Sequence, residues 1–395
     1  MVVSPNRHTR SRARVRVVAA AAVLGLALAA CGGNTGEAPT SEAGDGATAT
    51  AGATTQTAGS AAGPSSEGAA TGGSSGPGSS APSGEKPLVY GVFATPLEEP
   101  WDGAIHAALQ AAAADGTIVY KHTDNNDTPD KMTRTLTDVI TTEKPAIIIG
   151  DSFAAEDQVR AVAAKYPETP FVFGSGGKTV DPNFSIFDNW LQDPAFLAGM
   201  LAGGMTKSNT IGVVAAMPIP EVNRIVNAFI AGVKESNDKA TVKVTFINSF
   251  FDPATAKQAA LAQVAAGVDV LFAERAGVIE AAKEKNLPVI GMMVDQKSEA
   301  PKNVVTSLVW NMRPTIDHIV HEYTKTGTVK AQDLAEFSFM KNGGSSIAPI
   351  NTDVPGGVPD TVKSAVEAKQ KAIEDGSFTT PVNEEAPAGS TTVGG

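Results

Sequence analysis

Short apolar runs that alternate with amphipathic stretches restrict the fold of this chain more than any other feature. Between residues 86 and 383 most of these runs are continuously apolar, as is typical of strands buried on both faces of a sheet. The segments between them carry apolar residues at helical spacing, as at Ile225, Phe229 and Val233. Repeated strand, helix, strand order predicts parallel sheets covered by helices. The expected strands cover residues 88–93, 117–122, 146–150, 171–174, 210–216, 242–248, 268–273, 288–294 and 304–308.

Two pauses in this alternation indicate two lobes instead of one sheet. The pauses fall at 184–194 and 296–303. We assign 86–190 and 304–330 to lobe 1, which includes a helix at 314–326, and 191–303 and 331–383 to lobe 2. Residues 384–395 are expected to form a flexible, frayed tail. Sites in doubly wound α/β folds form at the carboxyl ends of strands, so we expect a ligand cleft between the lobes.

The first 30 residues have the pattern of an export signal. Residues 2–16 hold five arginines and no acid, and they lead into an apolar stretch, 17–30, that is too short to span a bilayer. The following Leu28-Ala29-Ala30-Cys31 resembles the lipobox of bacterial lipoproteins, in which the cysteine becomes the lipidated first residue. The resemblance implies a lipid anchor at Cys31 on the extracytoplasmic face of the cell membrane. An ordinary cleavage site beside a chance cysteine is the alternative.

A low-complexity segment separates Cys31 from the apolar runs. Of the 54 residues at 32–85, 47 are Ala, Gly, Ser, Thr or Pro, and none is a large apolar residue. Such a segment cannot bury enough surface to fold, so 31–85 is predicted to be a disordered linker that spans roughly 40 Å. Without residues 1–30 the chain has 26 basic and 42 acidic side chains, which argues against nucleic acid as a partner. We expect a monomer.

The motifs of covalent and nucleotide-hydrolysing enzymes are missing from the predicted folded part. Gly177-Lys178-Thr179 ends like a phosphate loop, but the glycine required five residues before Gly177 is Val172. No Gly-x-Ser-x-Gly elbow is present, and the only cysteine lies in the leader region. His318 and His321 are candidate metal ligands on one helix face, although a solvated helix surface is favoured. We therefore expect neither an enzyme nor a metal or cofactor.

Aromatic residues are the best candidates for contacts to a ligand. All three tryptophans fall in or beside loops at the carboxyl ends of expected strands, and a Phe-Phe-Asp sequence forms a fourth such loop. Aromatic faces with Asp or Asn beside them suit a flat ring with a polar edge. Hinge or core packing is the alternative for each aromatic, and loop charge is the alternative for Glu98 and Glu99, which could rim the cleft. The candidates in these loops are Trp101, Asp102, Asn189, Trp190, Phe250, Phe251, Asp252 and Trp310.

Several segments together resemble the basic membrane protein family of bacterial substrate-binding lipoproteins. The likeness runs over residues 88–326 and is carried by 196–199, 211–214, 229–233, 249–254, 267–272, 281–285 and 289–291, with Asp295-Gln296. It implies a type I periplasmic-binding-protein fold, in which two Rossmann-like lobes close on a ligand and deliver it to an ABC importer. Characterised relatives bind purine nucleosides. A surface adhesin or regulator of the same fold is the alternative function, and a nucleoside hydrolase is disfavoured by the missing nucleophile and Asp cluster.

The resemblance also implies roles for single residues. Pro100-Trp101-Asp102 stands where the family has Ser-Phe-Asn, so Trp101 takes the place of a phenylalanine that stacks on the base. Phe250 or its neighbour Phe251 would supply the opposing face.

Two departures from the family pattern bear on the ligand. Met293, two residues before Asp295, stands where the family has an acid that resembles a ribose anchor, and Trp310 stands where a lysine is usual. A ribose would lose two charged partners at these positions. We therefore expect a nucleobase or another small flat heterocycle to bind at least as readily as an intact nucleoside.

Overall fold

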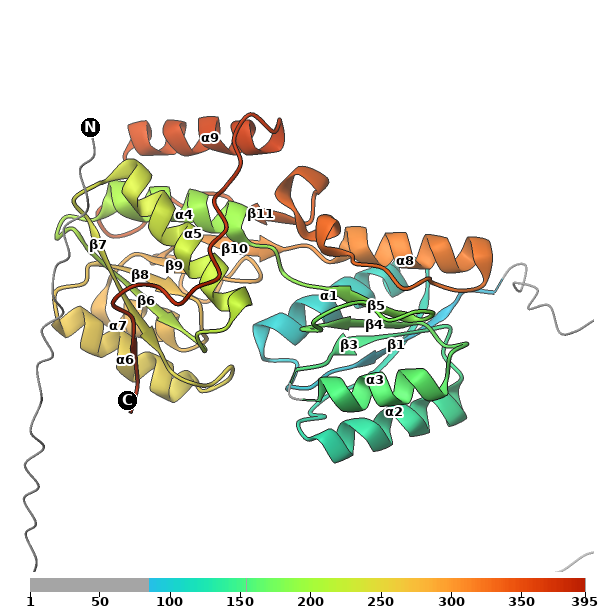
Figure 1. Cartoon of the computed structure of the whole chain (residues 1–395). Coiled ribbons are helices and arrows are strands. Elements are labelled where there is room, and N and C mark those ends of the chain that lie inside the picture. The colour runs from blue at the N-terminus through green and yellow to red at the C-terminus, as the bar shows by residue number, and fades with distance from the viewer. Residues whose placement is uncertain (1–84, 154, 395) are drawn as a thin grey trace, which may run out of the picture. The chain divides into compact units, whose positions relative to one another are not determined.

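Runs of valine, isoleucine and phenylalanine build two sheets in the computed structural model, which describes residues 85–153 and 155–394 (Figure 1). The first sheet is parallel, with strand order β2-β1-β3-β4-β5. Its strands are β1 (Leu88–Val92), β2 (Val119–Thr123), β3 (Ile147–Asp151), β4 (Phe171–Gly174) and β5 (Phe184–Phe187). All residues of β3 and β4 are buried, as expected for strands covered on both faces.

Helices cover both faces of this first lobe. Apolar residues of α1 (Pro100–Ala114) and α8 (Arg313–Thr326) share one buried cluster with Val89, Ile147 and Val172. Residues of α2 (Pro129–Glu143) and α3 (Glu156–Lys165) form a second cluster on the other face with Ile148 and Phe173. Figure 1 shows this three-layer arrangement.

The second sheet has the order β11-β10-β9-β8-β6-β7-β12, and only the β10–β11 pair is antiparallel. Its strands are β6 (Thr210–Ala215), β7 (Thr241–Phe246), β8 (Val270–Ala273), β9 (Val289–Gly291), β10 (Val304–Trp310), β11 (Ser345–Ile347) and β12 (Thr391–Thr392). The short helices η1 (Ala335–Ser338) and η2 (Met340–Asn342) precede β11.

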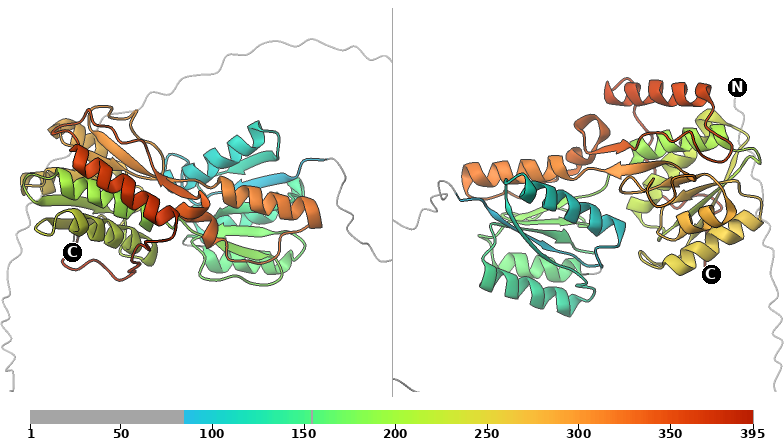
Figure 2. Two further views of the ribbon diagram at one scale, coloured as in Figure 1. Left: turned by 90° about the horizontal axis from the view of Figure 1, so that it is seen from above. Right: turned by 180° about the vertical axis from the view of Figure 1, so that it is seen from behind.

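Five helices pack around the second sheet. Helices α4 (Gln192–Met205) and α5 (Pro220–Ser236) cover one face, and α9 (Asp360–Glu374) packs outside α4, as the views of Figure 2 also show. Helices α6 (Pro253–Ala265) and α7 (Val278–Lys285) cover the other face. A Cβ atom at Gly199 of α4 would lie 2.1 Å from the Phe229 carbonyl oxygen, and one at Gly232 of α5 would lie 1.9 Å from that of Phe196. Glycine at both positions therefore lets the two helix backbones pack closely.

These observations confirm the predicted architecture of two Rossmann-like lobes. Each expected strand is present, although β9 is only three residues long. The sequence pattern missed β5, β11 and β12. Strand β5 lies at the start of the region 184–194 that we interpreted as a pause, where a four-residue strand at a sheet edge gives little periodic signal.

The structure corrects the expected points at which the chain changes lobes. Strand β10 was assigned to lobe 1, but it pairs with β9 and β11 in the second sheet, so the chain returns to lobe 1 only after Trp310. Residues 331–334 were assigned to lobe 2. They instead stay beside β5, where the Ile186 N–H donates to the Gln332 carbonyl oxygen and the Leu334 N–H donates to that of Ile186.

The C-terminal segment is not the frayed tail that the sequence suggested. Thr391 and Thr392 form β12, which pairs in parallel with Thr245 and Phe246 at the edge of the second sheet. Its low-complexity composition concealed these backbone hydrogen bonds, because they depend on an open sheet edge and not on side chains.

The predicted signal peptide, the lipidation site Cys31 and the linker at 32–84 lie outside the described residues. Within the residues that are described, none of the helices combines the length and the apolar character needed to cross a membrane.

Candidate functional site

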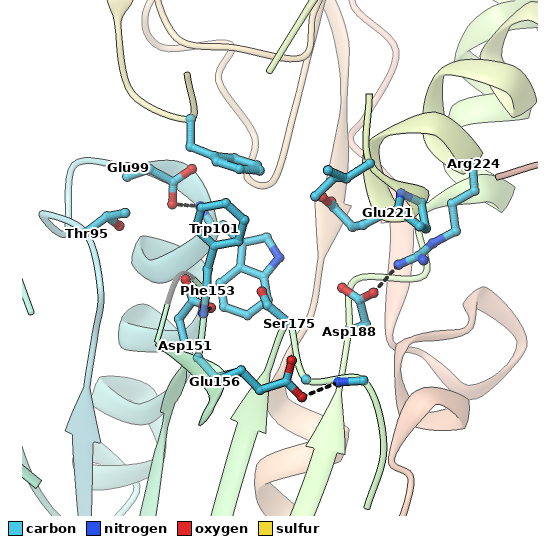
Figure 3. Close-up of a pocket in the computed structure, with 16 residues that line it drawn as sticks. Thr95, Glu99, Trp101, Asp151, Phe153, Glu156, Ser175, Asp188, Glu221 and Arg224 are labelled. Atoms are coloured by element: carbon cyan, nitrogen blue, oxygen red, sulfur yellow. Dashed lines mark hydrogen bonds and ion pairs between the residues drawn. The ribbon is translucent and has the colours of Figure 1, made fainter. Parts of the chain in front are cut away.

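A cavity of about 430 Å³ lies between the two lobes, where loops at the carboxyl ends of strands from both sheets meet (Figure 3). Lobe 1 contributes loops that follow β1, β3, β4 and β5, and lobe 2 contributes loops that follow β6 and β7. This is the position expected for a ligand site in a doubly wound fold. Its lining residues are Thr95, Glu99, Trp101, Asp151, Ser152, Phe153, Glu156, Ser175, Gly176, Gly177, Asp188, Ile219, Pro220, Glu221, Arg224 and Phe250.

Trp101 is held at the cavity by the start of helix α1. The Glu99 side chain caps this helix and accepts hydrogen bonds from the backbone N–H groups of Trp101, at 2.9 Å, and Asp102, at 3.1 Å. The indole stacks on the Phe187 ring, with centroids 5.8 Å apart. A Cβ atom at Gly174 would lie 2.0 Å from Trp101 Cη2, so glycine at the end of β4 leaves the space that the indole fills.

Phe250 brings a second aromatic ring to the cavity from lobe 2. It meets Phe153 of lobe 1 edge to face, with ring centroids 4.7 Å apart. The Arg275 guanidinium lies 5.4 Å from the centroid of the Phe250 ring and donates to the Phe250 carbonyl oxygen at 3.0 Å. Rings from both lobes therefore line the same space.

A buried ion network joins the lobes beside Phe250. Arg275, which follows β8, lies 2.8 Å from a Glu274 oxygen and 3.2 Å from a Glu99 oxygen, and all three side chains are almost fully buried. Loss of solvation raises the pKa of Glu99 and Glu274 despite the attraction of the guanidinium, and the two carboxylates raise the pKa of Arg275. Glu99 thus caps α1 and also contacts the other lobe.

Arg224, on α5, forms a second contact between lobes. Its guanidinium lies 2.5 Å from Asp188, in the crossover after β5, and 3.3 Å from Glu384 near the C-terminus. Its guanidinium carbon also lies 4.2 Å from the centroid of the Trp190 ring. Figure 3 shows Arg224 directed at Asp188 on the lobe 2 side of the cavity.

Two further carboxyl groups at the cavity, those of Asp151 and Glu221, have raised pKa values. Burial, with repulsion from neighbouring carboxylates, raises the pKa of Asp151 to about 7 and that of Glu221 to about 8. The Asp151 carboxylate accepts a hydrogen bond from the Phe153 N–H at 2.8 Å. Glu221 Oε1 is buried and has no hydrogen-bond partner among the described residues.

The glycine loop after β4 lies at the cavity but does not present a free anion site. The Gly177 N–H donates to Glu156 Oε1 at 2.8 Å, and Arg160 donates to the same oxygen. The Gly177 N–H is therefore already used by a carboxylate of the protein.

Three of the predicted site residues are packed beneath the cavity instead of lining it. Trp310 is 3% exposed, packs on Trp101 with centroids 5.0 Å apart, and donates from Nε1 to Ser338 Oγ. Met293 is fully buried, and its sulfur lies 3.8 Å from the Asn189 amide nitrogen. The ends of β9 and β10 therefore contribute core packing at this point.

The other predicted residues also lie outside the cavity lining, in buried, capping or surface positions. Asp102 is fully buried and accepts hydrogen bonds from Thr95, and Asp252 caps α6 through Thr255. The remaining three do not line the cavity: Trp190 packs against Phe339 and Arg224, Phe251 is 39% exposed, and Asp295 is exposed and accepts from the Lys297 N–H. Trp101 and Phe250 thus line the cavity, and so does Glu99, which we considered as a residue at its rim.

The two histidines considered as metal ligands have different surroundings. His318 Nε2 lies 2.7 Å from the Gln332 amide oxygen, and His321 is exposed. Across residues 85–153 and 155–394, no group of three histidine, cysteine or acidic side chains is placed to hold a metal ion.

Sequence reasoning considered Glu99 as a residue at the rim of the cleft, and Glu99 does line the cavity, but it missed Asp151, Glu221 and Arg224. Asp151 ends β3, and Glu221 lies in the first turn of α5, directly after the short loop that follows β6. Both are charged residues that come at or shortly after the carboxyl end of an apolar strand, which is the signal that selected the aromatic candidates. Arg224 lies one helical turn beyond Glu221 and gave no separate signal.

The sequence matches the family described as "ABC transporter substrate-binding protein PnrA-like" over residues 96–342. Over 182 residues it is 35% identical to a Haloferax volcanii protein named as a candidate ABC transporter glucose-binding protein, a match that covers 45% of this chain and 46% of that protein. A Brucella abortus purine-binding protein is 29% identical over 60% of this chain and 67% of its own length. A Lactococcus lactis ABC transporter nucleoside-binding protein is 26% identical over 60% of this chain and 71% of its own length. The chain thus spans less than half of the Haloferax protein and about two thirds or more of the other two.

A solved structure supports the same fold. The ABC transporter solute-binding protein of Conexibacter woesei superposes with a TM-score of 0.61 at 20% identity, over 75% of this chain and 98% of that one. The two lobes, each built on a mainly parallel sheet, therefore form the fold of a type I periplasmic binding protein. With a family match over more than half of its length, the chain belongs to the PnrA-like ABC transporter substrate-binding proteins.

Proposed function

We propose that this protein captures a small planar heterocycle, a nucleobase or a nucleoside, in the cavity between its lobes and delivers it to an ABC importer. The observation that carries this proposal is the presence of Trp101 from lobe 1 and Phe250 from lobe 2 in the lining of one 430 Å³ cavity. That volume falls within the usual range for small-molecule sites. A ligand that touches both lobes stabilises their contact, and a permease can then recognise that state.

The polar groups of the cavity favour a ligand that donates hydrogen bonds. Asp151, Asp188 and Glu221 supply acceptor oxygens, whereas Arg224 is the one guanidinium in the lining and already contacts Asp188. Ring N–H and amino groups of a nucleobase, or the hydroxyls of a ribose, match such acceptors. The carboxylate at the Gly177 N–H disfavours a nucleotide, because a phosphate would be repelled there.

The names of two related proteins agree with this ligand class, and the name of a third adds a sugar to the ligands that should be tested. The Brucella relative is named for purine binding and the Lactococcus relative for nucleoside binding. The Haloferax relative is named for glucose, so a sugar belongs among the ligands to be compared. We further propose that the mature protein is held on the extracytoplasmic face of the membrane through Cys31.

Isothermal titration calorimetry with adenine, hypoxanthine, guanosine, inosine and glucose tests the ligand class. We expect the bases to bind at least as tightly as the nucleosides, because Met293 and Trp310, which stand where relatives have charged residues, are buried outside the cavity lining and offer no charged anchor for a ribose. Much tighter binding of the nucleosides would overturn the preference for bases, and binding of glucose alone would overturn the proposal of a heterocycle. Mass spectrometry of any small molecule that co-purifies with the protein provides an independent answer.

A further inference from the structure

Carboxylates outnumber guanidinium groups in the cavity lining. Among the described residues that line it, the acidic ones are Glu99, Asp151, Glu156, Asp188 and Glu221, and Arg224 is the one basic residue. This excess is significant because an ionised carboxylate that is removed from water is unstable without a nearby positive charge.

Three of these carboxylates already have a cationic partner. Glu99 is paired with Arg275, Glu156 with Arg160 at 2.6 Å, and Asp188 with Arg224. The protein itself therefore neutralises this part of the negative charge.

The remaining two carboxylates, Asp151 and Glu221, form no ion pair with any described residue. Asp151 is 6% exposed and comes from the end of β3 in lobe 1. Glu221 comes from the first turn of α5 in lobe 2, and its buried Oε1 has no hydrogen-bond partner among the residues described. Figure 3 shows the two side chains on opposite sides of the cavity. Each lobe thus presents to the same space one carboxyl group that forms no ion pair with a described residue.

We propose that the ligand carries a positive charge: it is a protonated or quaternised nitrogen heterocycle whose charged edge lies between Asp151 and Glu221 and whose ring packs against Trp101 and Phe250. This inference rests on the proposed function, in which the cavity holds a planar ring. Charge-assisted hydrogen bonds to carboxylates are stronger than neutral ones. The aromatic faces of the lining favour a cation as well.

Such a ligand makes binding depend on pH. Asp151 and Glu221 hold protons more readily than ordinary carboxyl groups, and a cation between them favours their ionised forms, so binding releases protons. The charged groups that act on Glu221 are Asp188, Glu274, Arg224 and Arg275, and those that act on Asp151 are Glu99, Asp102 and Asp188. Acidification protonates the two carboxyl groups and weakens the preference for a cation.

Matched pairs of probes test the charge of the ligand. One pair is N1-methylnicotinamide, a fixed cation, and nicotinamide, which is neutral. The other pair is 1-methyladenosine, which is protonated at neutral pH, and adenosine. By calorimetry at pH 7.5 we expect at least one cation to bind at least about tenfold more tightly than its neutral partner, and this ratio to fall at pH 5.5. Neutral partners that bind as tightly as the cations, or a ratio that does not fall, would overturn the inference.

Two variants test whether Glu221 in the cavity causes the preference for a cation. Glu221→Gln is expected to reduce the ratio of cation to neutral affinity about tenfold, because the affinity for the cation falls more than the affinity for the neutral probe. Glu168→Gln removes the same charge at an exposed position outside the cavity and is expected to leave the ratio unchanged. An unchanged ratio in Glu221→Gln contradicts the proposed role of this residue.

If adenine, hypoxanthine or a nucleoside binds but no cation is preferred, this inference alone fails. If no heterocycle of either charge binds, the proposed function fails with it.

Discussion

The Arg275 guanidinium of lobe 2 lies 3.2 Å from the Glu99 carboxylate of lobe 1, and each of the two side chains is 3% exposed. Glu99 also caps α1, the helix that carries Trp101. This ion pair therefore links the contact between the lobes to the position of an aromatic ring in the cavity. Because Arg275 also contacts Glu274 at 2.8 Å, its charge remains partly compensated when Glu99 is changed.

Replacing Glu99 by glutamine is expected to weaken the contact between the lobes. Glu99→Gln removes a buried charge-assisted hydrogen bond and should lower the free energy of unfolding by about 1 to 3 kcal/mol. The radius of gyration of the ligand-free protein, measured by small-angle X-ray scattering, should increase as the lobes separate. The adjacent Glu98 is exposed, so Glu98→Gln is the matched control and should change neither quantity. An unchanged radius in Glu99→Gln would show that other contacts hold the lobes together.

Two neighbouring phenylalanines allow a direct test of ring stacking. Phe250 lines the cavity, whereas Phe251 is 39% exposed and does not. Phe250→Ala should weaken binding of adenine by about 1 to 3 kcal/mol, or roughly 5- to 150-fold, because one face of the bound ring loses its aromatic partner. Phe251→Ala should change the affinity less than about twofold. Calorimetric titration of both variants makes the comparison, and equal losses would remove Phe250 from the site.

The contrast between these rings shows how far the sequence pattern determines the site. Loops at the carboxyl ends of strands were correctly expected to meet between the lobes, because that follows from the parallel order of the strands. The direction of each side chain was not predictable. Trp310 ends β10 as Asp151 ends β3, yet the indole is sealed beneath Trp101 and the carboxyl group lines the cavity. Strands buried on both faces carry no alternation that would distinguish the two directions.

Contacts between residues far apart in the sequence set a second limit on prediction. The pairs Glu99–Arg275 and Asp188–Arg224 depend on the relative placement of the two lobes, and no local spacing indicates them. The same holds for β12, whose hydrogen bonds depend on the free edge of β7. The architecture of the lobes was therefore predictable from periodicity, whereas the ion pairs of the site could be identified only from the structure.

The raised pKa values of Asp151 and Glu221 predict that stability falls as pH rises. Their pKa values, about 7 and about 8 in the folded protein, lie above the ordinary values near 4, so the folded protein binds more protons than the unfolded chain in this window. The associated stability is fully present below about pH 4 and is lost as pH rises through about 7 to 8.

Thermal unfolding of the ligand-free protein at pH 5.5 and pH 8.5 measures this loss, which we expect to be on the order of a few kcal/mol. Glu221→Gln mimics the protonated form and should reduce the difference between the two pH values by raising stability at pH 8.5. Glu168→Gln, at an exposed position, should behave like the wild-type protein. A wild-type protein that is more stable at pH 8.5 than at pH 5.5 would contradict the assigned pKa directions.

Gly174 is expected to control the position of the Trp101 ring. A Cβ atom at this residue would lie 2.0 Å from Trp101 Cη2 and 2.9 Å from Phe187 Cε2, so Gly174→Ala forces the stacked pair apart. Overpacking of this kind costs about 1 to 3 kcal/mol. We expect a lower midpoint of thermal unfolding, an altered near-ultraviolet circular dichroism spectrum and weaker binding of adenine.

Gly177, in the loop that follows Gly174, provides the control for this substitution. A Cβ atom there would meet its nearest neighbour, Glu156 Oε1, at an ordinary contact distance of 3.6 Å. Gly177→Ala should therefore change stability by less than about 0.5 kcal/mol and leave the aromatic spectrum intact. Similar effects of the two substitutions would point to the loop backbone, and not to the indole, as the source of the loss.

The C-terminal segment is expected to support the site through Arg224. Glu384 contacts the Arg224 guanidinium at 3.3 Å, and Asn223 and Asn227 of α5 donate hydrogen bonds to backbone carbonyl groups of residues 383–385. The Glu384 side chain is 44% exposed, so its ion pair is worth about 0.2 to 1 kcal/mol. Glu384→Gln should then weaken binding of adenine by at most about fivefold, whereas Glu385→Gln, which removes an exposed carboxylate without an ion pair among the described residues, should leave binding unchanged.

Removal of residues 384–395 should have a larger effect than Glu384→Gln. The truncation also deletes carbonyl acceptors used by α5 and the pairing of β12 with β7. Arg224 would keep only its contact with Asp188 as an ion pair and would become more exposed, which lowers both its restraint and the electrostatic strength of that pair. Calorimetry and thermal unfolding of the truncated protein measure both consequences. Binding and stability equal to those of the full chain would show that the segment covers α5 without supporting the site.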